Sequence, residues 1–205
     1  MSEAQVELRP GDENPNGYLE DTIVIDWQTP VVFEKAKELT RDCETVESRL
    51  EALFTFVRDE IAHSFDIETD ELTCNASQVL RKGHGLCYAK SHLLVAMIRF
   101  CGIPAGFGFQ RLRSEGEGSR FVLHGFVGVK LPDDGRWVAL DPRGDNDAIQ
   151  TRFDLETPSL AYDPDPALGE ETLPEVHSKP VKHIVQLLEK AGSLDRARRT
   201  LPDAV

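Results

Sequence analysis

Residues 83–101 read GHGLCYAKSHLLVAMIRFC, a glycine-rich turn that runs directly into a strongly apolar segment. The apolar run is long enough for a buried helix, which we expect over about residues 86–101. Projected at about 100° per residue, Cys87 falls on the same stripe as Leu94 and Ile98. The pattern therefore predicts a cysteine in the first turn of a buried helix, facing inward, with more polar positions on the opposite side.

Two short strand-like runs follow, and each carries one polar residue of interest. Residues 122–126 contain His124, and residues 137–140 lead into Asp141. The Asp-Asp-Gly between them, at 133–135, is typical of a hairpin turn. A hairpin loop with an even number of residues pairs positions whose numbers sum to an odd value, so His124 and Asp141 share one face. One diagonal step apart, they are within hydrogen-bond reach.

A thiol, an imidazole and a carboxylate on these elements are the parts of a nucleophilic cysteine site. The positive end of a helix and a neighbouring imidazolium both favour the reactive thiolate form. The amide of Cys87 at a helix start is a natural donor to an oxyanion, and Asp141 would fix the tautomer of His124. The spacing permits a triad of these three residues.

Other interpretations of the cysteines and histidines stay open. His84 and Cys87 have the spacing of zinc ligands, but a structural zinc site needs a second closely spaced pair, which the sequence does not contain. We therefore expect no metal and no cofactor. We expect the remaining cysteines to be small core residues: Cys43, Cys74 and Cys101. We expect three histidines at the surface: His63, His177 and His183.

Four motifs in order resemble the transglutaminase-like superfamily, specifically the small bacterial proteins of that family described as transglutaminase-like or as cysteine proteases. The motifs are Gly85-Leu86-Cys87, Gly102-Ile103-Pro104, His124-Gly125-Phe126 and Trp137-Val138-Ala139-Leu140-Asp141-Pro142. The resemblance is strong over about residues 75–145 and looser before them. The sequence departs from the family pattern directly after the histidine, where the superfamily often has Ala-Trp and this chain has Gly-Phe. This difference alters the wall beside the site and leaves the triad unchanged.

The resemblance implies an α+β, papain-like fold: a helical N-terminal part and the cysteine helix packed on an antiparallel sheet. It implies that Cys87 is the nucleophile, His124 the general base and acid, and Asp141 the orienting carboxylate. A second oxyanion donor is not settled by the motifs. Gln78 and Gln110 are candidates, and each is equally compatible with a structural role.

The implied reaction is attack of a thiolate on an amide or ester carbonyl, a thioester intermediate, and transfer to water or to an amine. We expect hydrolysis of a peptide or amide substrate, because crosslinking needs a dry tunnel and no insertion is visible that would build one. The alternatives are a protein-glutamine or other amine acyltransferase, an acyltransferase of the arylamine N-acetyltransferase kind, and a non-catalytic binding or scaffold domain that retains the fold.

Composition sets limits on partners and location. The chain has 205 residues and a formal charge of −13, with 40% hydrophobic and 29% charged residues. A chain this acidic argues against nucleic-acid and membrane-surface partners. The N-terminal residues lack the basic start and apolar run of a signal peptide, so we expect a cytoplasmic protein with free thiols. The sequence leaves the oligomeric state open.

The rest of the chain is expected to form one transglutaminase-like domain over 1–205, with its core at about 75–145. We expect helices from Pro30, capped by Thr29, and from near Thr45. The expected short strand is 22–25, the sheet strands are 105–112, 120–131 and 136–141, and an acidic surface loop covers 64–75. In the tail, 158–205, an acidic proline-rich loop precedes an amphipathic helix that begins at Pro180, stops at Gly192 and packs on the core.

Overall fold

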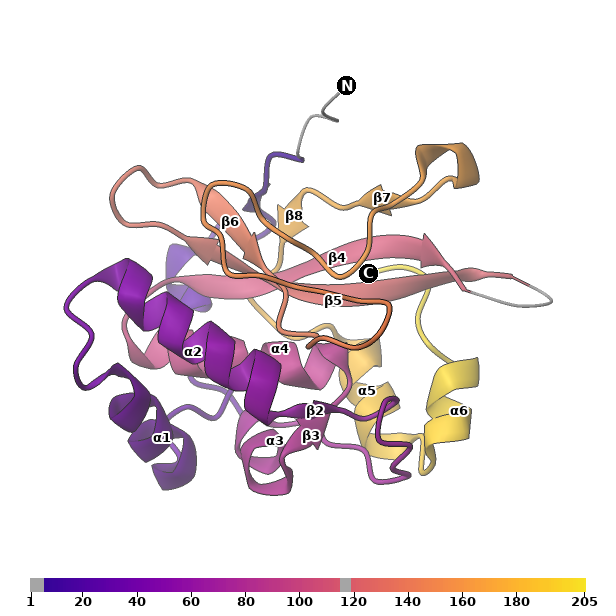
Figure 1. Cartoon of the computed structure of the whole chain (residues 1–205), viewed down its shortest axis with the longest axis horizontal. Helices are drawn as coiled ribbons and strands as arrows, with labels where there is room; N and C mark the ends of the chain where they lie inside the picture. Colours follow the sequence, from indigo (N-terminus) through magenta and orange to yellow (C-terminus); the bar gives the residue numbers. More distant parts are fainter. Residues whose placement is uncertain (1–5, 115–118) are drawn as a thin grey trace.

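The computed structural model describes residues 6–114 and 119–205, and it combines helices with a small sheet (Figure 1). The helices are α1 (Pro30–Thr40), α2 (Val46–Glu60), α3 (Ala76–Lys82), α4 (Cys87–Phe100), α5 (Lys182–Lys190) and α6 (Leu194–Arg199). The strands are β1 (Arg9–Pro10), β2 (Ala62–His63), β3 (His84–Gly85), β4 (Ala105–Arg113), β5 (Phe121–Lys130), β6 (Trp137–Leu140), β7 (Glu171–Thr172) and β8 (Glu175–Val176). Two 3-10 helices are η1 (Pro15–Tyr18) and η2 (Pro166–Leu168).

The first two helices begin where the sequence predicts. Pro30 is the first residue of α1, but the Thr29 hydroxyl donates to the carbonyl of Asp26 at 2.7 Å and does not cap the helix. At the start of α2, the Thr45 hydroxyl accepts from the Ser48 amide, and the Ser48 hydroxyl accepts from the Thr45 amide, both at 3.1 Å. This reciprocal capping box fixes the start of α2.

The strand expected at residues 22–25 does not form. The amide of Thr22 donates to the carbonyl of Ile25 at 3.3 Å, and the amide of Ile25 donates to the Thr22 hydroxyl at 3.0 Å. These bonds close a turn. Ile25 is fully buried in the core, so the apolar run serves packing and not strand pairing.

The main sheet has four antiparallel strands in the order β6-β5-β4-β7. In Figure 1 the helices α1–α6 lie on one side of this sheet, and β8, with its partner β1, lies on the other. Leu123 and Val127 of β5 belong to the core that includes α4, whereas Phe126 packs with Tyr18 and Val176 in a second, smaller cluster. The predicted α+β architecture, with the cysteine helix packed on an antiparallel sheet, is confirmed.

Helix α4 is buried as predicted, and its more polar side is buried as well. His92 and Arg99, which lie on the side of the helix opposite Cys87, are each only 2% exposed. Arg99 donates to the carbonyls of Glu20, Ala105 and Ser178, and His92 Nδ1 lies 2.8 Å from the Cys74 carbonyl oxygen. Because their polar atoms are paired, these residues can lie inside the core.

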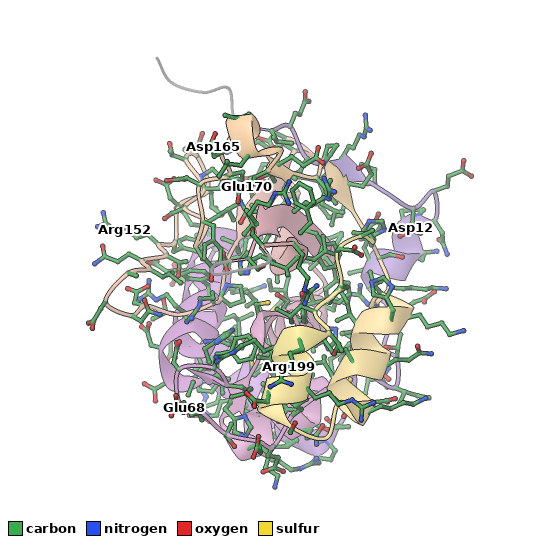
Figure 2. The ribbon with its side chains drawn as sticks, turned by 90° about the vertical axis from the view of Figure 1, so that its right-hand side faces the viewer. Asp12, Glu68, Arg152, Asp165, Glu170 and Arg199 are labelled. Atoms are coloured by element: carbon green, nitrogen blue, oxygen red, sulfur yellow. The ribbon has the colours of Figure 1, made fainter. Side chains whose placement is uncertain are left out.

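The tail continues beyond the predicted helix. Helix α5 is followed by Gly192, which has a φ of +73°, and then by α6, which the sequence analysis did not predict. Figure 2 shows these two helices side by side, with Arg199 labelled on α6. Five residues of these two helices and of the link between them lie in the same core cluster as α4: Ile184, Leu188, Ala191, Leu194 and Ala197. Within the described residues, no helix has both the length and the apolar character needed to cross a membrane.

The last residues run back to the sheet. Strand β6 pairs only with residues 127–130 of β5, which leaves the first part of β5 without a strand on that side. There the amide of Leu123 donates to the carbonyl of Pro202 at 2.7 Å. The Arg120 guanidinium donates to the carbonyls of Arg198, Arg199 and Leu201 at 2.8–3.2 Å. These bonds hold the C-terminal residues beside β5.

Candidate active site

Cys87 is the first residue of α4 and is half-buried. Strand β3 ends two residues earlier, where Gly85 pairs in parallel with His63 of β2. The first amides of a helix have no intrahelical acceptor, so the N–H of Cys87 is free to bind a ligand atom. The short strand pair and the helix together fix the position of the thiol.

His124 and Asp141 lie together as the parity of their numbers predicts. The register pairs Val127 with Leu140, which places Asp141 opposite Phe126 and one diagonal step from His124. His124 Nε2 lies 2.8 Å from Asp141 Oδ2, and both side chains are buried. The expected hydrogen bond between imidazole and carboxylate is therefore present.

The electrostatics of the pair depend on a balance between burial and charge. Burial alone would lower the pKa of His124, but the charge and hydrogen bond of Asp141, together with the nearby Cys87, raise it to about 10. Burial would raise the pKa of Asp141, whereas His124 and the backbone amides of Ala161 and Arg143 hold it below its usual value. His124 is thus a cation at neutral pH, and a cation beside a thiol favours the thiolate.

Asp141 is anchored by more than the imidazole. Its Oδ1 accepts from the Arg143 amide at 3.0 Å, and its Oδ2 accepts from the Ala161 amide at 2.8 Å. The buried Arg143 guanidinium binds both carboxylate oxygens of Asp66, at 2.5 and 2.8 Å. This network joins the end of β6 to the loop after β2, and it fixes the carboxylate that orients His124.

Tyr162 covers one side of the imidazole. Its ring meets the His124 ring edge to face, with centroids 4.9 Å apart and planes at 76°. The neighbouring amide of Ala161 is the one that binds Asp141. The loop after Thr157 therefore contributes a wall to the site, and about 38% of the Tyr162 surface remains exposed.

The two glutamines considered as oxyanion donors are engaged elsewhere. Gln78 in α3 accepts a hydrogen bond from the Cys74 amide at 2.9 Å. Gln110 is paired with His124 across the sheet, but its amide nitrogen donates to the Tyr162 carbonyl and the Thr172 hydroxyl. Both hydrogens of the Gln110 amide are thus in use.

His63 differs from its expected surface position. The residue is only 7% exposed, and its Nδ1 is enclosed without a hydrogen-bond partner in the described part of the chain. Its burial arises because β2 pairs with β3, a contact between segments about twenty residues apart that leaves no periodic signal in the sequence. Asp66 and Arg143 were likewise missed, because one lay in a predicted surface loop and the other in a turn.

Of the other cysteines, Cys74 is buried, whereas Cys43 and Cys101 are half-buried. Burial raises the pKa of Cys74 to about 12 and also raises that of Cys101. His84 Nδ1 lies 3.2 Å from the Ser64 hydroxyl. Across residues 6–114 and 119–205 there is no group of three or more His, Cys, Asp or Glu side chains arranged to hold a metal ion.

A cavity of about 1470 Å³ opens beside the site, under the loop that follows Thr157. Phe126, Trp137 and Leu160 give it an apolar floor, and Gln110 and Tyr162 line it as well. Cys87 and His124 are not among its lining residues. The cavity therefore touches residues next to the triad and not the thiol itself.

Comparison with known proteins bears on the family and on the fold. The family model of the transglutaminase-like superfamily matches residues 34–142, more than half of the chain. No protein with a curated description matches it. A structure described as a candidate cysteine protease from Cytophaga hutchinsonii is 18% identical, with a TM-score of 0.51 over 67% of this chain and 46% of that chain. This chain thus spans about half the length of that relative, and the likeness shows the fold.

Two further structures share less of the fold. The periplasmic domain of TgpA from Pseudomonas aeruginosa is 17% identical, with a TM-score of 0.45 over 63% of this chain and 47% of that chain. A candidate protease from Parabacteroides distasonis is 13% identical, with a TM-score of 0.42 over 81% of this chain and 30% of that chain.

Proposed function

The chain belongs to the transglutaminase-like superfamily, and from that premise we propose that it is a thiol-dependent acyl-transfer enzyme. Cys87 is the nucleophile, His124 the general base and acid, and Asp141 the residue that orients His124. The observation that carries the proposal is the buried 2.8 Å contact between His124 Nε2 and Asp141 Oδ2, beside the free thiol at the start of α4. A cationic imidazole next to a cysteine is the arrangement that activates a thiol.

The proposed reaction begins when the thiolate attacks the carbonyl carbon of an amide and the C=O electron pair moves onto oxygen. As the C–N bond breaks, His124 gives its proton to the leaving amine, and a thioester forms on Cys87. The neutral His124 then takes a proton from water as the water attacks the thioester. Release of the acid restores the thiolate and the imidazolium, and Asp141 holds the ring orientation throughout.

We favour water over an amine as the acceptor. Cys87 is half-buried and not enclosed, so water can reach a thioester formed on it. An enzyme that transfers to amines must keep water away from that intermediate. The substrate class we propose is a peptide or other amide, and the cytoplasmic location expected from the sequence stays a prediction.

The proposal is tested by screening intact protein against a peptide library, with Cys87→Ala as the control. Mass spectrometry identifies cleaved products, and glycine methyl ester added as a competing amine shows the partition between hydrolysis and aminolysis. We expect acids as the main product and no turnover by Cys87→Ala or His124→Ala. Predominant amide product would support the amine acyltransferase instead.

A labelling experiment separates an enzyme from an idle scaffold. Iodoacetamide should alkylate Cys87 far faster than Cys74 or Cys101, since burial raises the pKa of both of those thiols. Peptide mapping by mass spectrometry locates the adducts. Equal, slow labelling of the cysteines would mean that Cys87 is not activated, and the scaffold alternative would stand.

A further inference from the structure

His63 pairs in β2 with a residue of β3 that lies two positions before the proposed nucleophile. Its partner in β3 is Gly85, and the Ser64 amide donates to the Gly85 carbonyl at 3.0 Å. The turn from Gly85 through Leu86 then places Cys87 at the start of α4. The backbone of His63 is therefore fixed relative to the thiol by hydrogen bonds and not by side-chain packing alone.

The His63 ring is buried but unpaired. Its Nδ1 is enclosed and has no hydrogen-bond partner among the described residues, and its ring approaches the Phe65 ring edge-on, with centroids 5.6 Å apart. A buried polar atom without a partner is uncommon and calls for an explanation. A neutral imidazole carries one N–H and one lone pair. When the proton is on Nε2, the enclosed Nδ1 carries only a lone pair. Nε2–H is then the hydrogen-bond donor that can bind a ligand.

The charges around His63 keep it neutral. Burial lowers its pKa well below the ordinary value, the cations Arg143, Lys90 and His124 lower it further, and Asp66 partly opposes them. Two of these neighbours tie His63 to the site: His124 itself, and Arg143, which follows Asp141 and binds Asp66. The ring therefore presents an N–H without a positive charge that would compete with His124 for the thiolate.

We propose that the neutral imidazole of His63 donates a hydrogen bond from Nε2 to the oxyanion that forms when the thiolate attacks a carbonyl. The Cys87 amide is the other donor. This inference rests on the proposed function, because it assigns a further residue to the same reaction. It also replaces Gln110, whose amide hydrogens are already donated to Tyr162 and Thr172. His63 keeps its proton throughout, so it stabilises charge and transfers nothing.

Two reagents that act on the same thiol test the assignment. p-Nitrophenyl acetate acylates a thiolate through a tetrahedral oxyanion and releases p-nitrophenolate. Iodoacetamide alkylates it by direct displacement of iodide, with no oxyanion. The ratio of the two rates at Cys87, followed by absorbance and by peptide mapping, isolates oxyanion stabilisation from thiolate formation. The variants are His63→Phe, which keeps a ring against Phe65, and His63→Gln, which keeps an N–H donor.

We expect His63→Phe to lower the acylation rate about 10²- to 10³-fold with the alkylation rate unchanged, as for loss of one oxyanion donor. His63→Gln should recover part of the loss. The matched control His84→Phe, which replaces the neighbouring buried histidine in the same strand pair, should leave the ratio as in the wild type. An unchanged ratio in His63→Phe, or an equal fall in both rates, overturns the assignment. If wild-type Cys87 fails to react selectively with iodoacetamide, it is the proposed function that fails.

Discussion

At the scale of single residues, two opposing influences set the charge of His124. Burial disfavours a cation, while the Asp141 carboxylate 2.8 Å away favours it strongly enough that the pKa rises to about 10. Asp141 can do this because Arg143 and Ala161 donate amides to it, which keeps the carboxylate ionised in a buried place. A buried carboxylate stays ionised only with such partners.

Replacing Asp141 by asparagine should therefore lower the pKa of His124. Without the carboxylate charge, burial becomes the main influence, and we expect the pKa of His124 to fall below its ordinary value of 6.5. NMR titration of the ring should show this shift. Turnover on any substrate that needs Cys87 should drop by about 10²- to 10⁴-fold while the fold is kept. Full turnover in this variant would contradict the assigned role.

The raised pKa also predicts how stability depends on pH. A group whose pKa is higher in the folded than in the unfolded protein contributes fully below the unfolded value, here 6.5, and loses its contribution as pH rises through about 10. The difference in unfolding free energy between wild type and His124→Gln should therefore shrink between these values, by up to about 1.4 kcal/mol per pH unit. Urea unfolding at several pH values measures it. A difference that is constant with pH would contradict the raised pKa.

At the scale of elements, Lys90 joins three segments around the site. One turn after Cys87, its ammonium donates to the carbonyls of Arg58 and Ile61 at the end of α2 and of Arg143 after β6, at 2.5–3.3 Å. Burial lowers the pKa of Lys90 to about 7. The cysteine helix is thus bonded through one side chain to the segment that carries Asp141.

Gly144 lies close to both the Arg58 carbonyl and the Lys90 ammonium that binds it. Its φ is +90°, and an added Cβ would lie 3.0 Å from the Arg58 carbonyl oxygen and 3.1 Å from Lys90 Nζ. Gly144→Ala should destabilise the protein by more than the roughly 1 kcal/mol expected from a left-handed backbone alone. Gly192→Ala is the matched control, because its φ is +73° and nothing lies within 4 Å of the added atom.

Chemical denaturation of both glycine variants gives the comparison. We expect Gly144→Ala to lose more stability than Gly192→Ala and also to lose activity, because the Lys90 junction adjoins Asp141. Equal losses in the two variants would show that the contacts around Gly144 yield without strain and that only the backbone conformation matters.

At the scale of the whole molecule, the tail and the core share one packed interior. Ile184, Leu188 and Leu194 lie in the same cluster as α4, and the Ala161 amide binds Asp141. Removing residues 158–205 should cost several kcal/mol, since each buried aliphatic side chain contributes about 1.5–3 kcal/mol. It should also expose apolar surface, seen as dye binding, and abolish activity. A truncated protein that melts like the wild type and stays active would show the tail to be a separate appendage.

Much of this architecture follows from local patterns. The Asp-Asp-Gly turn and the parity of positions 124 and 141 predict the diagonal contact between imidazole and carboxylate, because strand periodicity is strict. The burial of His63 has no such signal, since two-residue strands carry no alternation. Helix α6 was missed because it is six residues long and rich in arginine, with only Leu194 and Ala197 buried. Long-range strand pairing decides the burial of His63, whereas α6 is too short for a periodic pattern to reveal it.

The bond between the Leu123 amide and the Pro202 carbonyl has a practical consequence for anyone who handles this protein. Val205 is three residues beyond Pro202, a distance of at most about 11 Å along an extended chain, and Leu123 adjoins His124. A group attached to Val205 therefore starts beside the part of β5 that carries His124. A bulky tag at Val205 would crowd this part of the strand, whereas a fluorophore placed there would report on changes beside His124.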